Sequence, residues 1–509
     1  MKAMLGAVLL ALESCASAPT PAQHPPAAGT APFADLLMSA EGCTSSPRAV
    51  SRAEAVADLA AMERILRGGY AGYEVLGRSG LDWDRLFREA RADLERLAEP
   101  IEPARLRQTL ATRLSALGDN HVALWDYSPH GWTGWSSTGH HQDAFTADVV
   151  LARDGDTWVV QSGHDAGARL EECAGWSLAE IVRPSVGPDL SLVYRLIVLS
   201  RGAPSPLDCR VHQAGESRRV ALAMRRLRVG WQEPRGAPTF EQHRGLTPRL
   251  RLRSLSEARA GALKAFAASA RALRGVRSLL LDVRGNRGGN DDWVTRWFVE
   301  LTSGELRYAT IEELQSEVTL QGDVNTAVCD RAQGGDSEGR DLVERELRRT
   351  QVDLESARRQ HGRPYRRWRA RTPVARGKAP APFAGRLVLL ADARCASSCE
   401  TFFLYARQIA GSVTVGENTG GVGAFGDVRL YRLPHSGLGF SAGKKWFHTE
   451  DPRALAPEGR GHLPDLWLDS DRAPELAERL AECLAETECA TRFRPVLDAQ
   501  RQPLTDGLH

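Results

Sequence analysis

The feature that most constrains the fold is an alternation of β-strand and α-helix patterns between Thr247 and Gly416. Short apolar runs typical of buried strands are each followed by a segment in which apolar residues recur at helical spacing. The predicted strands are Pro248–Leu255, Val276–Val283, Arg386–Ala391 and Val413–Gly416, and the predicted helices are Glu257–Leu273, Asp292–Leu301 and Ser398–Ile409. Such alternation is typical of an α/β domain.

Other patterns flank and interrupt this region. Apolar residues at helical spacing predict three amphipathic helices between Ala53 and about Asp119. From Gln142 to about Arg228 short β-rich runs surround one helix-like stretch near Leu190–Leu199, which indicates a small separate domain. The dense charge of Ser337–Arg371 predicts an exposed helical insertion.

These patterns divide the chain into seven parts. They are a signal peptide (1–15), a disordered tether (16–35), an N-terminal helical domain (36–125), a β-rich domain (142–228), an α/β domain (229–475) with a charged helical insertion (303–382), and a C-terminal tail (476–509).

The N-terminus indicates export. Met1–Leu12 has one lysine followed by an apolar run, about half of the roughly 20 residues that a permanent transmembrane helix needs. The following residues up to Cys15 resemble a bacterial lipoprotein cleavage box, in which Cys15 would be lipidated. Ordinary cleavage near Ala16–Ala18 and an uncleaved anchor remain alternatives. We expect a periplasmic protein or an outer-membrane lipoprotein of a bacterium.

The nine cysteines fit this location. Lipidation of Cys15 would leave eight, and an even number in an exported protein favours disulfides. The local pairs Cys173–Cys209 and Cys483–Cys489 are the ones that we expect. Zinc binding is the competing interpretation, but CASSC separates its cysteines by three residues and has no matching second half.

Charge excludes one class of partner. Sixty-six basic and 64 acidic residues leave a formal charge of +2, so no net positive field indicates nucleic-acid binding. Only five of the basic residues are lysines, and that shortage limits the catalytic schemes that the chain can use.

Two strand–turn–helix motifs could carry chemistry. In LLLDVRGNRGGNDDW (Leu279–Trp293), glycines at a helix start could form an oxyanion hole, or the turn could merely connect strand to helix. In the segment Arg386–Gly411, Ser397 and Glu400 form an S-x-x-E pattern. Ser397 could therefore cap the helix, or it could place a reactive oxygen where the helix dipole and the next N–H stabilise negative charge.

Three further segments complete the set. His121 follows the last N-terminal helix in ALGDNHVALWD, where a structural role is the alternative to a catalytic one. VGENTGGVGAFGDV (Val415–Val428) is a strand followed by a glycine-rich loop that could lie close to a bound backbone, and PEGRGHLPDLWL (Pro457–Leu468) follows near the end of the α/β region.

The order of these five motifs resembles the C-terminal processing (tail-specific) serine peptidase family, in particular the branch related to the tricorn core protease and interphotoreceptor retinoid-binding protein. The resemblance covers roughly Ala53–Leu468 and is weakest over Gln142–Arg228, where family members usually carry a peptide-binding PDZ domain. It implies a ββα-spiral catalytic domain of the kind found in Clp-type proteases and crotonases, a degenerate PDZ-like domain, a protein or peptide substrate, and no metal or organic cofactor.

The resemblance also assigns roles. Ser397 matches the nucleophile, with Ser398 as its neighbouring rival, and the N–H groups of Ser398 and Gly288 match the oxyanion donors, with Gly289 as the alternative to Gly288. Gly289, Thr419 and Gly420 are expected to contact substrate. Asp119, Glu458 and Glu400 are possible helper groups.

The general base divides the family. One branch uses a lysine three residues after the threonine of GExTxG, and this chain has Val422 there. Lys444 and Lys445 lie on a later segment. The other branch takes a histidine after the N-terminal helices, which His121 matches, and an imidazole with a pKa near neutrality can remove the serine proton and return it to the leaving amine.

We therefore expect an exported serine peptidase with Ser397 as nucleophile and His121 as base. The first alternative is a non-catalytic peptide- or ligand-binding relative, in which a Cys395–Cys399 disulfide would hold the serine badly aligned. A crotonase-type acyl-CoA enzyme is a weaker alternative, because export separates the chain from coenzyme A.

Overall fold

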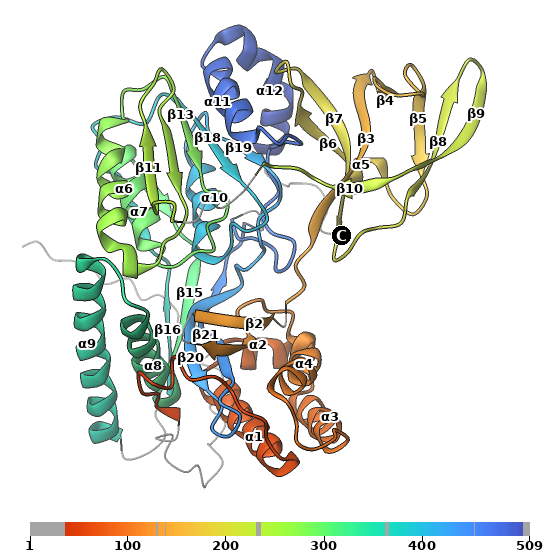
Figure 1. The fold of residues 1–509 in the computed structure, drawn as a ribbon. Helices are drawn as coiled ribbons and strands as arrows, with labels where there is room; N and C mark the ends of the chain where they lie inside the picture. The colour runs from red at the N-terminus through yellow and green to blue at the C-terminus, as the bar shows by residue number, and fades with distance from the viewer. Residues whose placement is uncertain are drawn as a thin grey trace, which may run out of the picture. The chain divides into compact units, whose positions relative to one another are not determined.

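A computed structural model describes residues 36–128, 131–137, 139–230, 236–361, 366–451 and 454–501 (Figure 1). The centre of the larger sheet consists of parallel strands in the order β12 (Arg249–Leu252), β13 (Ser278–Asp282), β18 (Arg386–Ala391), β19 (Val413–Gly416) and β22 (Leu466–Trp467). Strand β11 (Phe240–His243) adds an antiparallel edge beside β12. The predicted α/β class is confirmed, and β18 and β19 have the predicted bounds.

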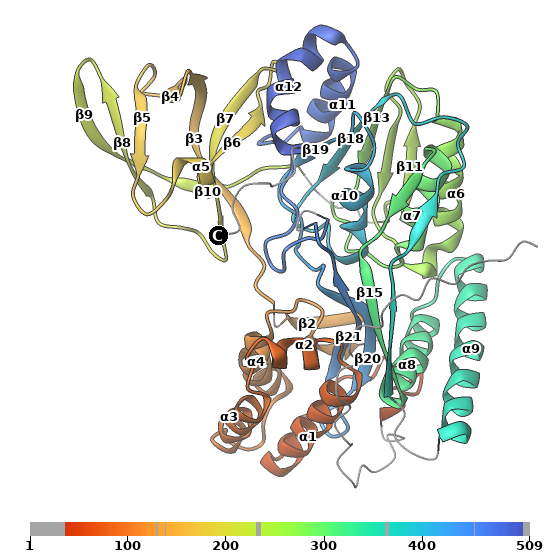
Figure 2. The same ribbon diagram turned by 180° about the vertical axis from the view of Figure 1, so that it is seen from behind.

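Helices cover both faces of this sheet. Successive side chains of a strand point to opposite faces, and in β13 the side chains on both faces are apolar. On β13, Leu279 and Leu281 pack with α6 (Ala260–Ala272), α7 (Asp292–Leu301) and α10 (Thr401–Ala406). Leu280, between them, packs with α11 (Ala473–Leu484) and α12 (Thr487–Arg501). Figure 2 shows these two helices beside the strands of the sheet. The expected C-terminal tail is therefore largely these two helices, and α11 lies on the parallel sheet.

The β-rich region continues the same sheet. Its strands are β3 (Asp143–Asp154), β4 (Thr157–Val160), β5 (Arg169–Cys173), β6 (Val182–Val186), β7 (Leu192–Ser200), β8 (Leu207–Gln213), β9 (Glu216–Leu222) and β10 (Met224–Arg226), with the short helix α5 (Leu178–Ile181). Ser185 of β6 pairs in parallel with Trp467 of β22, which joins the two regions. A PDZ-like identity of this region stays a prediction.

The helix expected near Leu190–Leu199 is wrong. That stretch is strand β7, which pairs antiparallel with β3 and with β6. Its β-branched and aromatic residues favour a strand, and the surrounding sheet supplies partners for both of its edges.

The N-terminal region holds one more helix than predicted. Its helices are α1 (Arg52–Gly69), α2 (Gly72–Arg78), α3 (Trp83–Glu95) and α4 (Pro103–Leu114). Ser51 and Glu54 form a capping box at the start of α1. The additional helix, α2, has only seven residues and contains two glycines, so its periodic signal is weak.

A second sheet links these helices to the C-terminal half of the chain. Its strands are β1 (Ala123–Ser128), β2 (Gly131–Ser137), β15 (Thr310–Ser316), β16 (Arg366–Arg371), β20 (Phe425–Arg432) and β21 (Gly439–His448). Strand β1 pairs with β21, which pairs in turn with β20. This pairing brings the segment around His121 against a hairpin about 300 residues later in the sequence.

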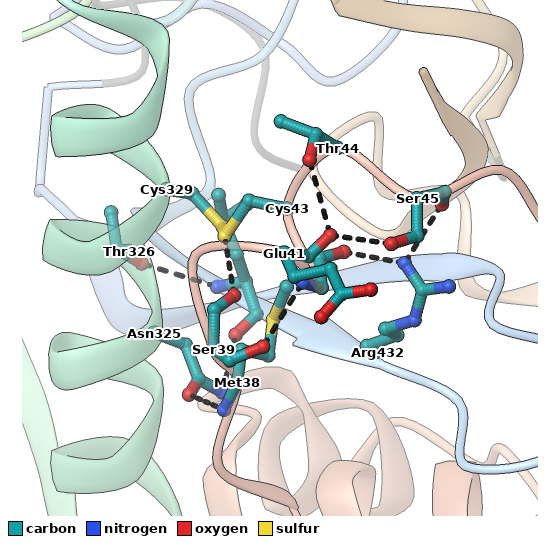
Figure 3. Close-up of a disulfide and its surroundings, with 12 residues drawn as sticks. Met38, Ser39, Glu41, Cys43, Thr44, Ser45, Asn325, Thr326, Cys329 and Arg432 are labelled. Atoms are coloured by element: carbon teal, nitrogen blue, oxygen red, sulfur yellow. Dashed lines mark hydrogen bonds between the residues drawn. A yellow bond between two sulfur atoms is a disulfide. The ribbon is translucent and has the colours of Figure 1, made fainter. Parts of the chain in front are cut away.

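The predicted insertion is only partly exposed. It contains α8 (Glu317–Gln333), α9 (Ser337–His361) and the two-stranded pair β14 (Glu305–Arg307) and β17 (Val374–Arg376), besides β15 and β16. The end of the predicted helical stretch, Arg366–Arg371, is strand β16, so the helix was wrong there, because pairing with β15 decides its conformation. One side of α8 is buried. There Asn325 accepts a hydrogen bond from Met38 N (2.8 Å) and donates to Leu36 O (2.8 Å), and Cys329 forms a disulfide with Cys43 (Figure 3).

The described cysteines form four disulfides: Cys43–Cys329, Cys173–Cys209, Cys395–Cys399 and Cys483–Cys489. The two expected local pairs are thus confirmed. Within the described ranges no cluster of side chains could hold a metal ion, and no helix is long and apolar enough to cross a membrane. Cys15 lies outside the described residues.

Candidate active site

Ser397 lies in the turn after strand β18, at the start of the 3₁₀ helix η4 (Ser397–Cys399). Its backbone is in the left-handed region, with φ of +56°, a conformation that residues other than glycine rarely adopt. The N-cap of this helix is Ala396 rather than Ser397, and the hydrogen bond that the described residues offer to Ser397 Oγ is with His121 Nε2. The capping interpretation is therefore wrong, and the serine oxygen points elsewhere.

That oxygen lies against His121. Ser397 Oγ is 2.9 Å from His121 Nε2, although the two residues are 276 positions apart. On the other side of the ring, His121 Nδ1 lies 2.5 Å from the carbonyl oxygen of Phe425, which can only accept a hydrogen bond. Nδ1 therefore carries the proton in the neutral ring, and Nε2 is free to accept the Ser397 hydroxyl.

Asp119 and Glu458 support the backbone around His121 rather than its ring. Asp119 accepts hydrogen bonds from His121 N and from the Tyr70 hydroxyl, both at 2.7 Å. Glu458 accepts from Asn120 N (3.0 Å) and from the backbone before β20. The group that contacts Nδ1 of the imidazole is the Phe425 carbonyl, and a helper role of the two carboxylates through the His121 segment stays a prediction.

Burial shifts the pKa values of these groups. Burial lowers the pKa of His121 from 6.5, while the charge of Asp119 opposes that shift. Burial also raises the pKa of Asp119, and it raises the pKa of Glu458 well above its usual value, with the Asp119 charge adding to the effect. The imidazole is therefore neutral at pH 7, as a general base must be.

Glu400 organises the loop that follows β19. Its buried carboxylate accepts hydrogen bonds from the Thr419 hydroxyl (2.5 Å), Gly421 N (2.9 Å) and Val422 N (2.8 Å). Burial raises the pKa of Glu400, and these donors oppose the rise. Glu400 thus holds the nucleophile turn against the loop.

Thr419 and Gly420 are part of the same framework. The Thr419 hydroxyl accepts from His462 N (2.7 Å), and Gly420 N donates to Cys395 O (2.8 Å). Thr419 is fully buried. These polar groups are occupied within the turn, whereas we expected the two residues to contact substrate.

The two glycines after β13 differ in whether their backbone N–H is already hydrogen-bonded. Gly288 N donates to Asn286 Oδ1 (2.9 Å), so this N–H is already used. A Cβ at Gly288 would lie 2.8 Å from Ala396 O and 3.0 Å from Ser398 N, so only glycine allows this approach to the nucleophile turn. The N–H groups of Gly289 and Ser398 have no acceptor among the residues that the structure describes.

Ser398 and the late lysines are engaged in other contacts. The Ser398 hydroxyl donates to Gly289 O at 2.6 Å, which removes it as a rival nucleophile in this geometry. Lys444 pairs with Asp323 (3.0 Å), and Lys445 pairs with Asp427 (2.7 Å). Both lysines are held in ion pairs on β21.

Sequence reasoning missed two members of the site. The Phe425 carbonyl leaves no signal in the sequence, because every residue has one. Tyr70 lies at the end of α1, and its contact with Asp119 depends on the packing of α1 against the loop that contains His121. The glycine-rich run after β19 was the nearest available signal for the Phe425 segment.

In this α/β fold a serine hydroxyl lies within hydrogen-bond reach of a histidine ring, an arrangement that serine-type hydrolases use. Residues 249–466, which contain Ser397 but not His121, match the family model "Peptidase family S41".

Solved structures show more distant similarity. Mature CPAF has 16% identity and a TM-score of 0.45, covering 87% of this chain and 98% of its own. The photosystem II D1 C-terminal processing protease has 16% identity and a TM-score of 0.35, covering 86% of this chain and 98% of its own. The tricorn protease has 12% identity and a TM-score of 0.38, covering 86% and 37%. The chain matches no curated protein sequence.

Proposed function

We propose that the chain is an exported peptidase that cleaves peptide bonds by acyl transfer, with Ser397 as nucleophile and His121 as general base. The observation that carries this proposal is the 2.9 Å contact between Ser397 Oγ and His121 Nε2, made by the tautomer that the Phe425 carbonyl selects. This contact favours catalysis over the non-catalytic alternative, which required a misaligned serine.

The first half of the reaction forms an acyl-enzyme. His121 Nε2 takes the hydroxyl proton while Ser397 Oγ bonds to the substrate carbonyl carbon. The unused N–H groups of Ser398 and Gly289 are the donors that would stabilise the oxyanion. The intermediate then collapses as the C–N bond breaks and His121 gives the proton to the leaving amine.

The second half releases the acyl product. A water molecule gives its proton to His121 Nε2 and attacks the ester carbon, and collapse of this intermediate returns the proton to Ser397 Oγ. No step requires a metal ion or an organic cofactor.

Export is supported by two independent features. The sequence of Met1–Cys15 resembles the export signal of a bacterial lipoprotein, and four disulfides link the described part of the chain. We propose a periplasmic or outer-membrane location, with the membrane contacted only through a lipid on Cys15, and a protein or peptide as substrate.

A fluorophosphonate probe tests the nucleophile. Such probes phosphonylate only a serine that a neighbouring base activates, so the wild-type protein should be labelled and Ser397→Ala should not. Ser398→Ala keeps its backbone N–H and should still be labelled, although more slowly. Labelling that persists in Ser397→Ala would exclude the assignment.

A further inference from the structure

We propose that the Cys395–Cys399 disulfide is a positioning device for the nucleophile: it holds the Ser397 backbone in the conformation in which Oγ reaches His121. The inference rests on the proposed function and deepens it. It predicts that the disulfide contributes to the chemical step more than to the stability of the fold.

The bridge spans the nucleophile. Its two cysteines are four positions apart, Ser397 is the residue midway between them, and both cysteines are fully buried. Ser397 has a φ of +56°. A residue with a Cβ leaves the left-handed region unless the surrounding structure holds it there. A covalent ring closed around Ser397 restricts the backbone rotations by which it would leave.

Both ends of the ring are attached to fixed parts of the site. Cys395 O accepts the hydrogen bond from Gly420 N (2.8 Å), and so ties the ring to the loop that Glu400 organises. Cys399 belongs to the core cluster under helices α6, α7 and α10. Between the cysteines, Ala396 N donates to Asn286 O (3.2 Å), which connects the ring to the glycine turn after β13.

Global stability alone is a poor explanation for this bridge. The stabilisation that a disulfide gives by restricting the unfolded chain grows with the length of the closed loop, and this loop is very short. Its local effect is different, because the backbone rotations between each cysteine and Ser397 determine where Ser397 Oγ lies relative to His121 Nε2. A displacement of about 1 Å at such a position can slow a reaction about 100-fold.

The chain supplies a matched control. Cys483–Cys489 also closes a short loop, with a separation of six positions, and it links α11 to α12. Among the described contacts this bridge makes none with Ser397 or His121. The two bridges are therefore comparable in loop length and differ in whether they enclose the nucleophile.

The experiment compares Cys395→Ala/Cys399→Ala with Cys483→Ala/Cys489→Ala and with wild type. We expect the first double variant to lose at least tenfold in kcat and in the limiting rate of fluorophosphonate labelling, with KM within about twofold of wild type. The control should keep both rates within about twofold, and the melting temperatures of the two variants should be similar. Equal rates in the first double variant and wild type, or equal losses in the two variants, would overturn the inference.

A second measurement, on wild-type protein, tests the inference even if the Cys395→Ala/Cys399→Ala variant does not fold. Wild-type protein is incubated with a graded concentration of a dithiol reductant, which gives two electrons and two protons to each disulfide, and the free thiols are then mapped by mass spectrometry. As the oxidised fraction of Cys395–Cys399 decreases, the rate of labelling at Ser397 should decrease in proportion. The rate should recover when the bridge is reoxidised. Full labelling of molecules in which this bridge is reduced would contradict the inference.

Different results would refute the proposed function and the role of the Cys395–Cys399 disulfide. Wild-type protein that is never labelled at Ser397 refutes the proposed function, and the inference with it. If the wild-type protein is labelled at Ser397 and the labelling rate does not depend on the Cys395–Cys399 disulfide, only the inference is refuted.

Discussion

His121 determines how the proposed reaction depends on pH, because only the neutral imidazole can accept the Ser397 proton. Burial lowers the pKa of His121 from its ordinary 6.5, so protonation that stops the reaction should begin only below that value. The labelling rate should therefore rise with pH through a midpoint below 6.5 and level off above that midpoint. A midpoint above 6.5 in the measured pH–rate profile would contradict the buried, neutral histidine.

Asp119→Asn should move that profile in a direction that a merely structural role does not predict. The Asp119 charge raises the His121 pKa against the effect of burial, so its removal should lower the midpoint further. The Asn side chain can still accept from His121 N and can donate to the Tyr70 hydroxyl. We expect a lower plateau rate as well, because the imidazolium formed during the reaction loses a nearby negative charge. An unchanged midpoint would show that Asp119 is not electrostatically coupled to the base.

At the scale of elements, the nucleophile turn and the loop after β19 depend on one another through Glu400. Glu400→Gln replaces a carboxylate oxygen by an NH₂ group that would face a backbone or hydroxyl donor, so at least one buried hydrogen bond must be lost. We expect the free energy of unfolding to fall by about 1–3 kcal/mol, measured by urea denaturation, together with a lower labelling rate. The half-exposed Glu63 on α1 provides the control substitution, Glu63→Gln, which should leave both quantities nearly unchanged. Equal stability of Glu400→Gln and wild type would mean that this carboxylate does not organise the loop.

The elements also show how far the sequence determines the fold. Strands β18 and β19 and helix α7 have the predicted bounds, because their apolar runs and helical periodicity are unambiguous. Strand β7 has an apolar run that also suits a helix, and only its partners β3 and β6 decide its conformation. Ser397 and His121 could be named from motif order. The Phe425 carbonyl could not, since it is a backbone atom whose position is set by tertiary packing, and the motif order left Gly288 and Gly289 as alternatives.

At the scale of the whole molecule, Cys43–Cys329 links the start of the described chain to helix α8 over 286 positions (Figure 3). A bridge over so long a loop restricts the unfolded chain strongly. We expect Cys43→Ala/Cys329→Ala to lower the free energy of unfolding by about 2–4 kcal/mol with little effect on the labelling rate, since Asn325 would still hold the Leu36–Met38 segment. Urea unfolding measures the first quantity, with Cys483→Ala/Cys489→Ala as the short-loop comparison. A smaller loss than in that comparison would contradict the loop-length argument.

The central claim is that Ser397 Oγ, activated by His121, is the atom that attacks the substrate. The most direct measurement is the position of the covalent adduct after reaction with a fluorophosphonate, determined by proteolysis and mass spectrometry. The account predicts one adduct per chain on Ser397, forming at least about 1,000-fold more slowly when His121 is replaced by Gln. An adduct on Ser398 or on another residue, or an adduct on Ser397 that forms equally fast without His121, would contradict it.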